Sequence, residues 1–126
     1  YVKDYNSALN LVQNLYKTDP TNKSKWLDLM ANIYLSRKDY SNAFNAYKEA
    51  FLVEKNLSKR KEYFKKSLEI LLWSEKYDDL KTFLDSYYKE FLTDPEMAKF
   101  ILKTALATGD PKFAYKIALE IKQRGF

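Results

Sequence analysis

Apolar residues recur along the chain at the spacing of an amphipathic helix. One stretch has Leu27, Met30, Ala31 and Tyr34 in an i, i+3, i+4, i+7 pattern. Similar stripes are formed by Ala43, Tyr47, Ala50 and Phe51 and by Phe64, Leu68 and Leu71. The pattern predicts an all-α chain with seven helices, at about 4–18, 23–37, 40–56, 58–75, 77–92, 95–108 and 111–124.

The breaks between these stripes carry the residues that begin and end helices. Asp94 and Asp110 are each followed by proline, so the aspartate can cap the free amides while Pro95 or Pro111 takes the first helical position. Because the connections are only a few residues long, each helix is expected to run antiparallel to its neighbour. The chain is therefore expected to form successive helical hairpins.

One block of residues returns four times along the chain. Asp39-Tyr40 is followed by Ala43, Tyr47 and Ala50, and the blocks that begin at Asp4, Lys76 and Asp110 have the same spacing. The first residues of successive blocks lie 35, 37 and 34 positions apart. Recurrence at this period indicates stacked helix pairs. Ala8, Ala43 and Ala114 occupy the position where a small side chain lets two helices approach closely.

These residues resemble the tetratricopeptide repeat family. Leu27, Met30-Ala31 and Tyr34 occupy the large, apolar-small and aromatic places of that family's first helix. The glycine that ends the first helix is present only as Gly109, with Lys38 and Glu75 elsewhere. The resemblance implies a right-handed superhelical solenoid of antiparallel helix pairs. It divides one array over 1–126 into the second helix of a first repeat (1–22), a repeat (23–57) and two degenerate repeats (58–94 and 95–126).

Composition narrows the classes of function. The 126 residues are 46% hydrophobic, 17% aromatic and 31% charged, as in a folded protein. They include neither Cys nor His, which removes thiol nucleophiles, disulfides and the usual zinc sites from these residues. No phosphate loop or catalytic triad is recognisable, and Asp78-Asp79 suits a helix start better than acid-base catalysis. We expect no enzyme activity and no cofactor.

The resemblance implies that the first helix of each pair lines a concave groove that binds a protein or peptide. Asn32 is the best polar candidate, since an amide can pair with a peptide backbone, and Trp73 with Leu72 is the candidate apolar anchor. Trp73 covering the end of its own helix pair is the alternative. The predicted contacts are Lys25, Asp28, Asn32, Leu35, Glu62, Lys65, Glu69, Leu72, Trp73, Lys99 and Lys103. For each of them, a solvated wall without a ligand is the competing interpretation.

Charge argues against one specific partner and leaves another class open. Asp28, Glu62 and Glu69 place negative charge where the family's clamp for acidic chaperone C-termini needs neutral or positive groups. A partner with mixed charges, or a helix of another protein, suits the groove better. The net charge of +5 and the cluster around Arg60 and Tyr63 allow a nucleic-acid-binding repeat as the alternative, although interspersed acids argue against it.

The sequence gives few indications of the cellular compartment and of the larger protein to which the chain belongs. No apolar run approaches the roughly 20 residues that span a bilayer, so no membrane insertion by this fragment is expected. The chain begins at Tyr1 without Met, and we expect it to belong to a larger repeat protein, as a scaffold or as the noncatalytic domain of a glycan-processing or transport enzyme. Its Lys, Asn and Tyr usage resembles AT-rich bacteria, where such arrays serve envelope assembly or secretion. The sequence is compatible with a location in the periplasm or cell envelope and with a location in the cytoplasm.

Overall fold

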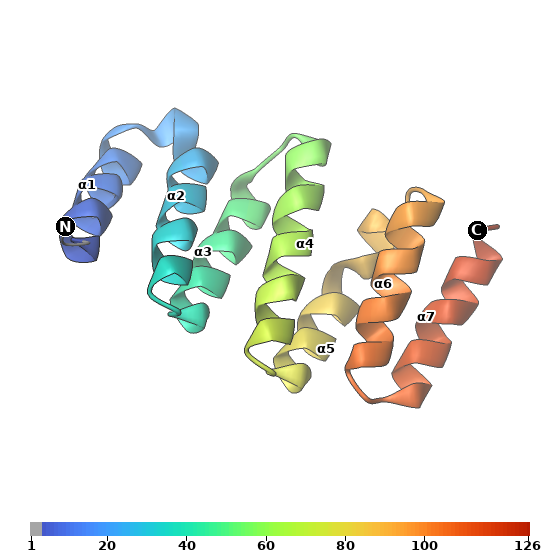
Figure 1. Cartoon of the computed structure of the whole chain (residues 1–126). Coiled ribbons are helices and arrows are strands. Elements are labelled where there is room, and N and C mark those ends of the chain that lie inside the picture. The colour runs from blue at the N-terminus through green and yellow to red at the C-terminus, as the bar shows by residue number, and fades with distance from the viewer. Residues whose placement is uncertain (1–3) are drawn as a thin grey trace. The chain divides into compact units, whose positions relative to one another are not determined.

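The computed structural model describes residues 4–126, which fold into helices without any strand (Figure 1). The α-helices of this range are α1 (Tyr5–Thr18), α2 (Lys23–Ser36), α3 (Tyr40–Val53), α4 (Leu57–Trp73), α5 (Tyr77–Tyr87), α6 (Pro95–Ala107) and α7 (Pro111–Gln123). The predicted all-α class and seven helices are confirmed, with most ends within three residues of those predicted.

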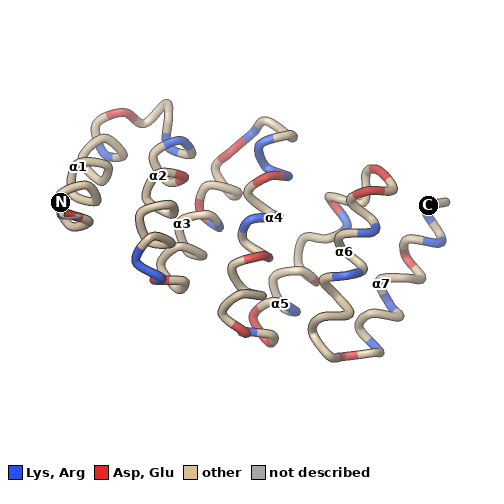
Figure 2. The backbone as a smooth tube through the Cα atoms, in the orientation of Figure 1, with Lys and Arg blue, Asp and Glu red and all other residues tan. Residues whose placement is uncertain are grey.

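Contacts divide the chain into two compact units, one ending at Ile70 and the other comprising Leu71–Phe126. The division falls inside α4. Within each unit, consecutive helices run antiparallel and are joined by short connections, as the sequence predicts (Figure 1). Basic and acidic residues are interspersed along the helices (Figure 2).

Aspartates begin four of the helices. Asp94 Oδ1 accepts the backbone N–H of Met97 at 2.8 Å, and Asp110 Oδ1 accepts those of Lys112 and Phe113 at 3.1 and 3.2 Å. Both helices have proline in the first turn, so the predicted caps are confirmed. Asp4 and Asp39, the first residues of two repeated blocks, cap α1 and α3 in the same way. Three of the four recurring blocks therefore include a capping aspartate, whereas Lys76, which begins the remaining block, makes no side-chain cap.

Three turns between helices place a residue in the left-handed region, where φ is positive. Gly109 follows α6 with φ +76°, and Lys38 and Glu75 follow α2 and α4 with φ +59° and +57°. These are the three positions that correspond to the helix-ending glycine of the repeat. Lys38 and Glu75 carry a Cβ in a conformation that glycine adopts without steric cost. Two of the three turns are thus built with the less suitable residue.

Replacing Glu75 by glycine is expected to stabilise the second unit by up to about 1 kcal/mol, because the Cβ strain is relieved without loss of a helical residue. The matched control is Lys103→Gly, an exposed position inside α6, where glycine should cost about 1 kcal/mol. Urea unfolding followed by Trp73 fluorescence in a Trp26→Phe background measures both. Destabilisation by Glu75→Gly would contradict the assigned turn.

Two helices end earlier than predicted. α3 ends at Val53 because the Glu54 carboxylate accepts the backbone N–H groups of Lys55 and Asn56, which turns the chain out of the helix. The predicted helix 77–92 is α5 followed by a 3₁₀ segment, Tyr88–Phe91. Tyr88 and Phe91 are both buried, and residues three apart share one face of a 3₁₀ turn. The tighter turn therefore lets both rings reach the core.

The first unit has an aromatic core between α3 and α4. Phe51 and Phe64 are fully buried with their ring centroids 5.9 Å apart, and Tyr47 lies 6.2 Å from Tyr63. Ala43 and Ala50 are also fully buried on α3, at the small positions of the recurring block. In the second unit, the fully buried side chains include Leu80, Leu84, Phe91, Ile101 and Ile117.

Candidate protein-binding surface

A polar cluster connects α2, α3 and α4 in the first unit. Its centre is Tyr47 on α3, which is 1% exposed and donates its hydroxyl to Oδ1 of Asn32 on α2 at 3.0 Å. The ammonium of Lys66 on α4 lies 5.3 Å from the Tyr47 ring centroid, within cation–π range. We call Asp28, Asn32, Tyr47, Glu62 and Lys66 the α2–α4 cluster.

Lys66 links the acidic residues of the cluster. Its Nζ lies 3.3 Å from Glu62 Oε1, one turn earlier on α4, and 3.8 Å from Asp28 Oδ1 on α2. The Asp28 Oδ1 atom is shielded from solvent and has no hydrogen bond, so the Lys66 ammonium is a charge partner without being a direct donor. Since these side chains are about a third or more exposed, the pairs orient the carboxylates more than they stabilise the fold.

Burial determines the protonation state of Tyr47. Removal of the hydroxyl from water, followed by the negative charge of Asp28, raises the pKa of Tyr47 far above its usual 10.0. The phenol is therefore held neutral, as a hydrogen-bond donor that fixes the Asn32 amide. The arrangement suits recognition by hydrogen bonds and charge.

The structure brings together five of the seven predicted contacts that lie in the first unit. Asp28, Asn32 and Glu62 belong to the α2–α4 cluster. Glu62, Lys65 and Glu69 line a shallow hollow of about 320 Å³ along α4, together with Ser58, Lys61 and Lys66. Lys25 lies exposed at the start of α2, with its ammonium 5.2 Å from the Trp26 ring. Leu35 is half-buried near the other end of α2.

The other predicted contacts belong to the second unit. Leu72 is half-buried at the end of α4, and the following Trp73 is 59% exposed, so most of its ring is accessible to a ligand. Lys99 and Lys103 are exposed one turn apart on α6.

Sequence reasoning missed two members of the cluster. Tyr47 belongs to the recurring block, whose spacing indicates packing, and the sequence pattern assigns no role to Lys66. The pair of Lys66 with Glu62 is local to α4, but the contacts of Lys66 with α2 and α3 depend on helix packing. A lysine within an apolar-aromatic stripe, next to the small Ser67, was the available signal.

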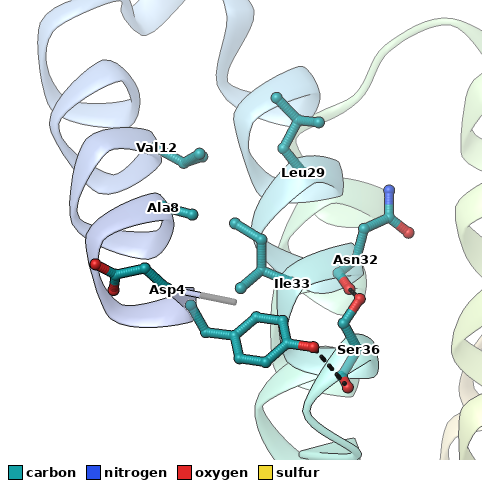
Figure 3. A pocket seen from close by; sticks show the side chains of 8 residues that line it. Asp4, Ala8, Val12, Leu29, Asn32, Ile33 and Ser36 are labelled. Atoms are coloured by element: carbon teal, nitrogen blue, oxygen red, sulfur yellow. Dashed lines mark hydrogen bonds between the residues drawn. The ribbon is translucent and has the colours of Figure 1, made fainter. Parts of the chain in front are cut away.

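Asn32 also borders a cleft between α1 and α2 (Figure 3). The cleft has a volume of about 520 Å³ and a mainly apolar lining that includes Ala8, Val12, Leu29 and Ile33. Ala8 is exposed there, whereas Ala43, its counterpart 35 residues later, is fully buried. Asn32 therefore borders the apolar cleft, while its amide points away from α1 and belongs to the polar cluster (Figure 3).

The residues proposed for nucleic-acid contact are engaged in packing. Arg60 Nη1 donates to the carbonyls of Phe51 and Glu54 at 2.8 and 3.2 Å, and its guanidinium lies 4.4 Å from the Phe51 ring. Tyr63 is only 6% exposed, so its ring cannot stack on a base. Arg60 therefore caps the carboxyl end of α3. A nucleic-acid-binding surface around Arg60 would have no contribution from the ring of Tyr63.

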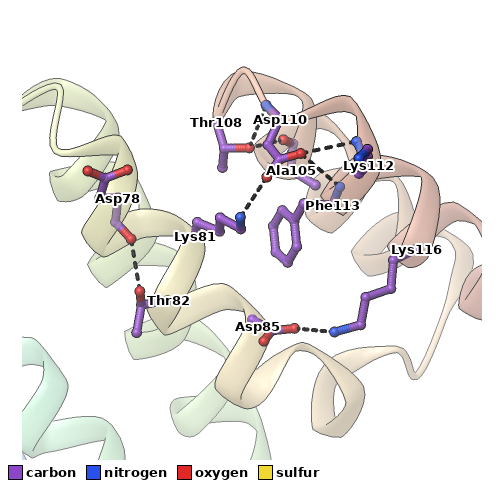
Figure 4. A network of polar contacts seen from close by, with 10 residues as sticks. All are labelled: Asp78, Lys81, Thr82, Asp85, Ala105, Thr108, Asp110, Lys112, Phe113 and Lys116. Atoms are coloured by element: carbon purple, nitrogen blue, oxygen red, sulfur yellow. Dashed lines mark hydrogen bonds and ion pairs between the residues drawn. The ribbon is translucent and has the colours of Figure 1, made fainter.

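A second polar network joins α5 to α7 (Figure 4). Lys81 Nζ lies 2.6 Å from Asp110 Oδ2, and Lys116 Nζ lies 2.8 Å from Asp85 Oδ1. The hydrogen bond from Lys81, followed by the Phe113 N–H, lowers the pKa of Asp110 below 3.8. The Asp85 carboxylate raises the pKa of Lys116. Each carboxylate has a lysine partner, so this network serves helix packing.

Acid is expected to destabilise the second unit through Asp110. Because its pKa is lower in the folded state, its contribution is present above the unfolded pKa and is lost as the pH falls through the folded value. The unfolding temperature should therefore fall between about pH 5 and about pH 2. Asp110→Asn, which retains a capping oxygen without titrating, should start lower and fall less. Parallel curves for the two proteins would contradict the role assigned to Asp110.

Two further kinds of feature are absent from residues 4–126, a membrane-spanning helix and a cluster of metal-ligating side chains. No helix in this range is long and apolar enough to cross a bilayer. Among the same residues, no three carboxylate, imidazole or thiol groups gather closely enough to hold a metal ion. In comparisons with known proteins, no family model, no curated protein and no solved structure matches this chain.

Proposed function

We propose that this chain is a non-catalytic scaffold, a tetratricopeptide-like right-handed array that binds another protein through the surface formed by α2 and α4. The observation that carries the proposal is the α2–α4 cluster. The buried phenol of Tyr47 fixes the Asn32 amide, while Lys66 holds Asp28 and Glu62 in place. Side chains restrained in this way lose little conformational entropy when a ligand binds.

The chemistry of the surface suits a peptide or helix with both signs of charge. Exposed Glu62 and half-buried Glu69 can accept hydrogen bonds from lysine or arginine, and Lys65 lies between them in the same hollow. Asn32 supplies an amide that can both donate to and accept from a peptide backbone. Mixed charges favour one register of the partner over others, which provides specificity more than affinity.

Site-specific photo-crosslinking in the cell that naturally produces this protein tests the proposal. A benzophenone amino acid at position 65 lies in the α4 hollow, and the control at position 45 lies on the exposed side of α3. We expect one discrete adduct from position 65, absent from position 45 and lost when Glu62 and Glu69 are both changed to Lys. A low-salt titration with single- and double-stranded nucleic acid completes the test. Equal adducts from both positions, or nucleic-acid binding that weakens steeply with salt, would argue against the proposal.

A further inference from the structure

The Asp28 carboxylate is incompletely paired within the α2–α4 cluster. Its Oδ1 atom is shielded from solvent and accepts no hydrogen bond. The Tyr47 hydroxyl donates to Asn32, and the Lys66 ammonium lies 3.8 Å from this oxygen, beyond the distance of a direct hydrogen bond. A shielded acceptor without a donor raises the free energy of the folded state. Asp28 is therefore a carboxylate that is stabilised by the arrival of a donor.

The Lys66 ammonium is shared unequally between two carboxylates. It lies 3.3 Å from Glu62 Oε1, closer than to Asp28 Oδ1. The Glu62 side chain is 58% exposed, whereas that of Asp28 is 32% exposed. The closer pair is thus the one that water screens more, and such exposed pairs contribute little to stability. A movement of the ammonium by about 1 Å would place it within hydrogen-bond distance of Asp28.

A second cation at Glu62 would drive this movement. Glu62 lines the α4 hollow together with Lys65 and Glu69, so its carboxylate is accessible to a side chain of a ligand. An arginine guanidinium presents two parallel N–H donors that match a carboxylate, whereas a lysine ammonium acts as a point charge. The bound guanidinium would repel the nearby Lys66 ammonium, because two like charges would then lie a few ångströms apart. Asp28 is already the second carboxylate beside Lys66.

We propose that the partner contributes an arginine that binds the Glu62 carboxylate, and that the Lys66 ammonium then moves from Glu62 to Asp28 Oδ1. This inference rests on the scaffold function proposed above and names the side chain by which the partner is recognised. The movement supplies the donor that Asp28 lacks, so satisfaction of this oxygen contributes to binding. A neutral or acidic side chain at the same place would leave Lys66 with Glu62.

Nuclear magnetic resonance of the Lys66 ammonium, in the whole chain labelled with ¹⁵N-lysine, tests the movement directly. The probes are an acetylated pentapeptide of alanine with a central arginine and the same peptide with citrulline, which has the shape of arginine without its charge. Added NaCl equalises the ionic strength. The arginine peptide should shift the Lys66 signal and slow its hydrogen exchange by at least about threefold, since a charge-assisted hydrogen bond protects the ammonium. The citrulline peptide should do neither.

Three variants identify the two carboxylates. Glu62→Gln should abolish the response to the arginine peptide. The matched control is Glu96→Gln, at an exposed glutamate 34 residues later that is followed one turn on by Phe100 in place of Lys66, and it should leave the response unchanged. Asp28→Leu removes the receiving carboxylate, so the signal should still shift but its hydrogen exchange should no longer slow.

Equal responses to the two peptides, or slowed exchange that persists in Asp28→Leu, would overturn the proposal. The comparison of the two peptides needs no variant, and circular dichroism verifies that each variant retains its helices. The scaffold function has a separate readout. A specific adduct at position 65 with an unresponsive Lys66 would overturn this inference alone, whereas a responsive Lys66 without any adduct would support the movement and contradict the scaffold function.

Discussion

Replacing Phe51 by Ala is expected to destabilise the first unit by about 3–5 kcal/mol, the usual cost of removing a fully buried aromatic side chain. Phe51 has no solvent exposure, and its ring lies 5.9 Å from that of Phe64 on the next helix. The Arg60 guanidinium covers the same ring at 4.4 Å. The substitution therefore leaves a cavity between α3 and α4 and removes the surface on which Arg60 rests.

Urea unfolding followed by Trp26 fluorescence, in a Trp73→Phe background, measures this loss in the first unit. The neighbouring Leu52 is the matched control, because it is 51% exposed on the same helix. Leu52→Ala should change the free energy of unfolding by only about 0.5 kcal/mol. Comparable losses for the two variants would mean that the face of α3 assigned to the core is wrong.

Replacing Ala43 by Leu is expected to cost about 1–3 kcal/mol, because the added atoms must overpack a full site. Ala43 lies on α3, which packs against α2, and has no exposed surface. A leucine there must push the two helices apart or adopt a strained rotamer. The effect tests whether the small residue of the recurring block is required where helices cross.

Ala8 provides the control that the repeat itself supplies. It occupies the same place in the block 35 residues earlier, but it is exposed and lines the cleft between α1 and α2. Ala8→Leu should therefore change stability by no more than about 0.5 kcal/mol. Urea unfolding of the two variants measures the difference. Equal losses at both positions would show that α1 is covered in the same way as α3.

The sequence was informative about the fold because the relevant signals are local. Helical spacing and the caps at Asp94 and Asp110 depend on residues within one or two turns. The early end of α3 and the 3₁₀ turn of Tyr88–Phe91 were not predicted. The first depends on a carboxylate that bonds to its own chain, and the second on two rings reaching a distant core. These interactions override the local helical preference, and they produce no periodic pattern in the sequence that could predict them.

The candidate surface was predictable only in part. Placing exposed residues on the first helix of each pair located Asp28, Asn32 and Glu62. The same reasoning could not place Tyr47 and Lys66 among them, because their roles arise from contacts between α2, α3 and α4. A tyrosine in an apolar stripe is expected to be buried in the core. Tyr47 is buried, but its hydroxyl also donates a hydrogen bond to Asn32.

Affinity for the protein captured at position 65 tests the proposed scaffold function most directly. Titration calorimetry would compare the original chain with Glu62→Lys/Glu69→Lys and with Asp78→Lys/Asp79→Lys. The second variant makes the same change of charge at exposed residues in the first turn of α5. Our account predicts binding weakened by about tenfold or more in the first variant and little changed in the second. Equal weakening in both, or none in the first, would contradict binding through the α2 and α4 surface.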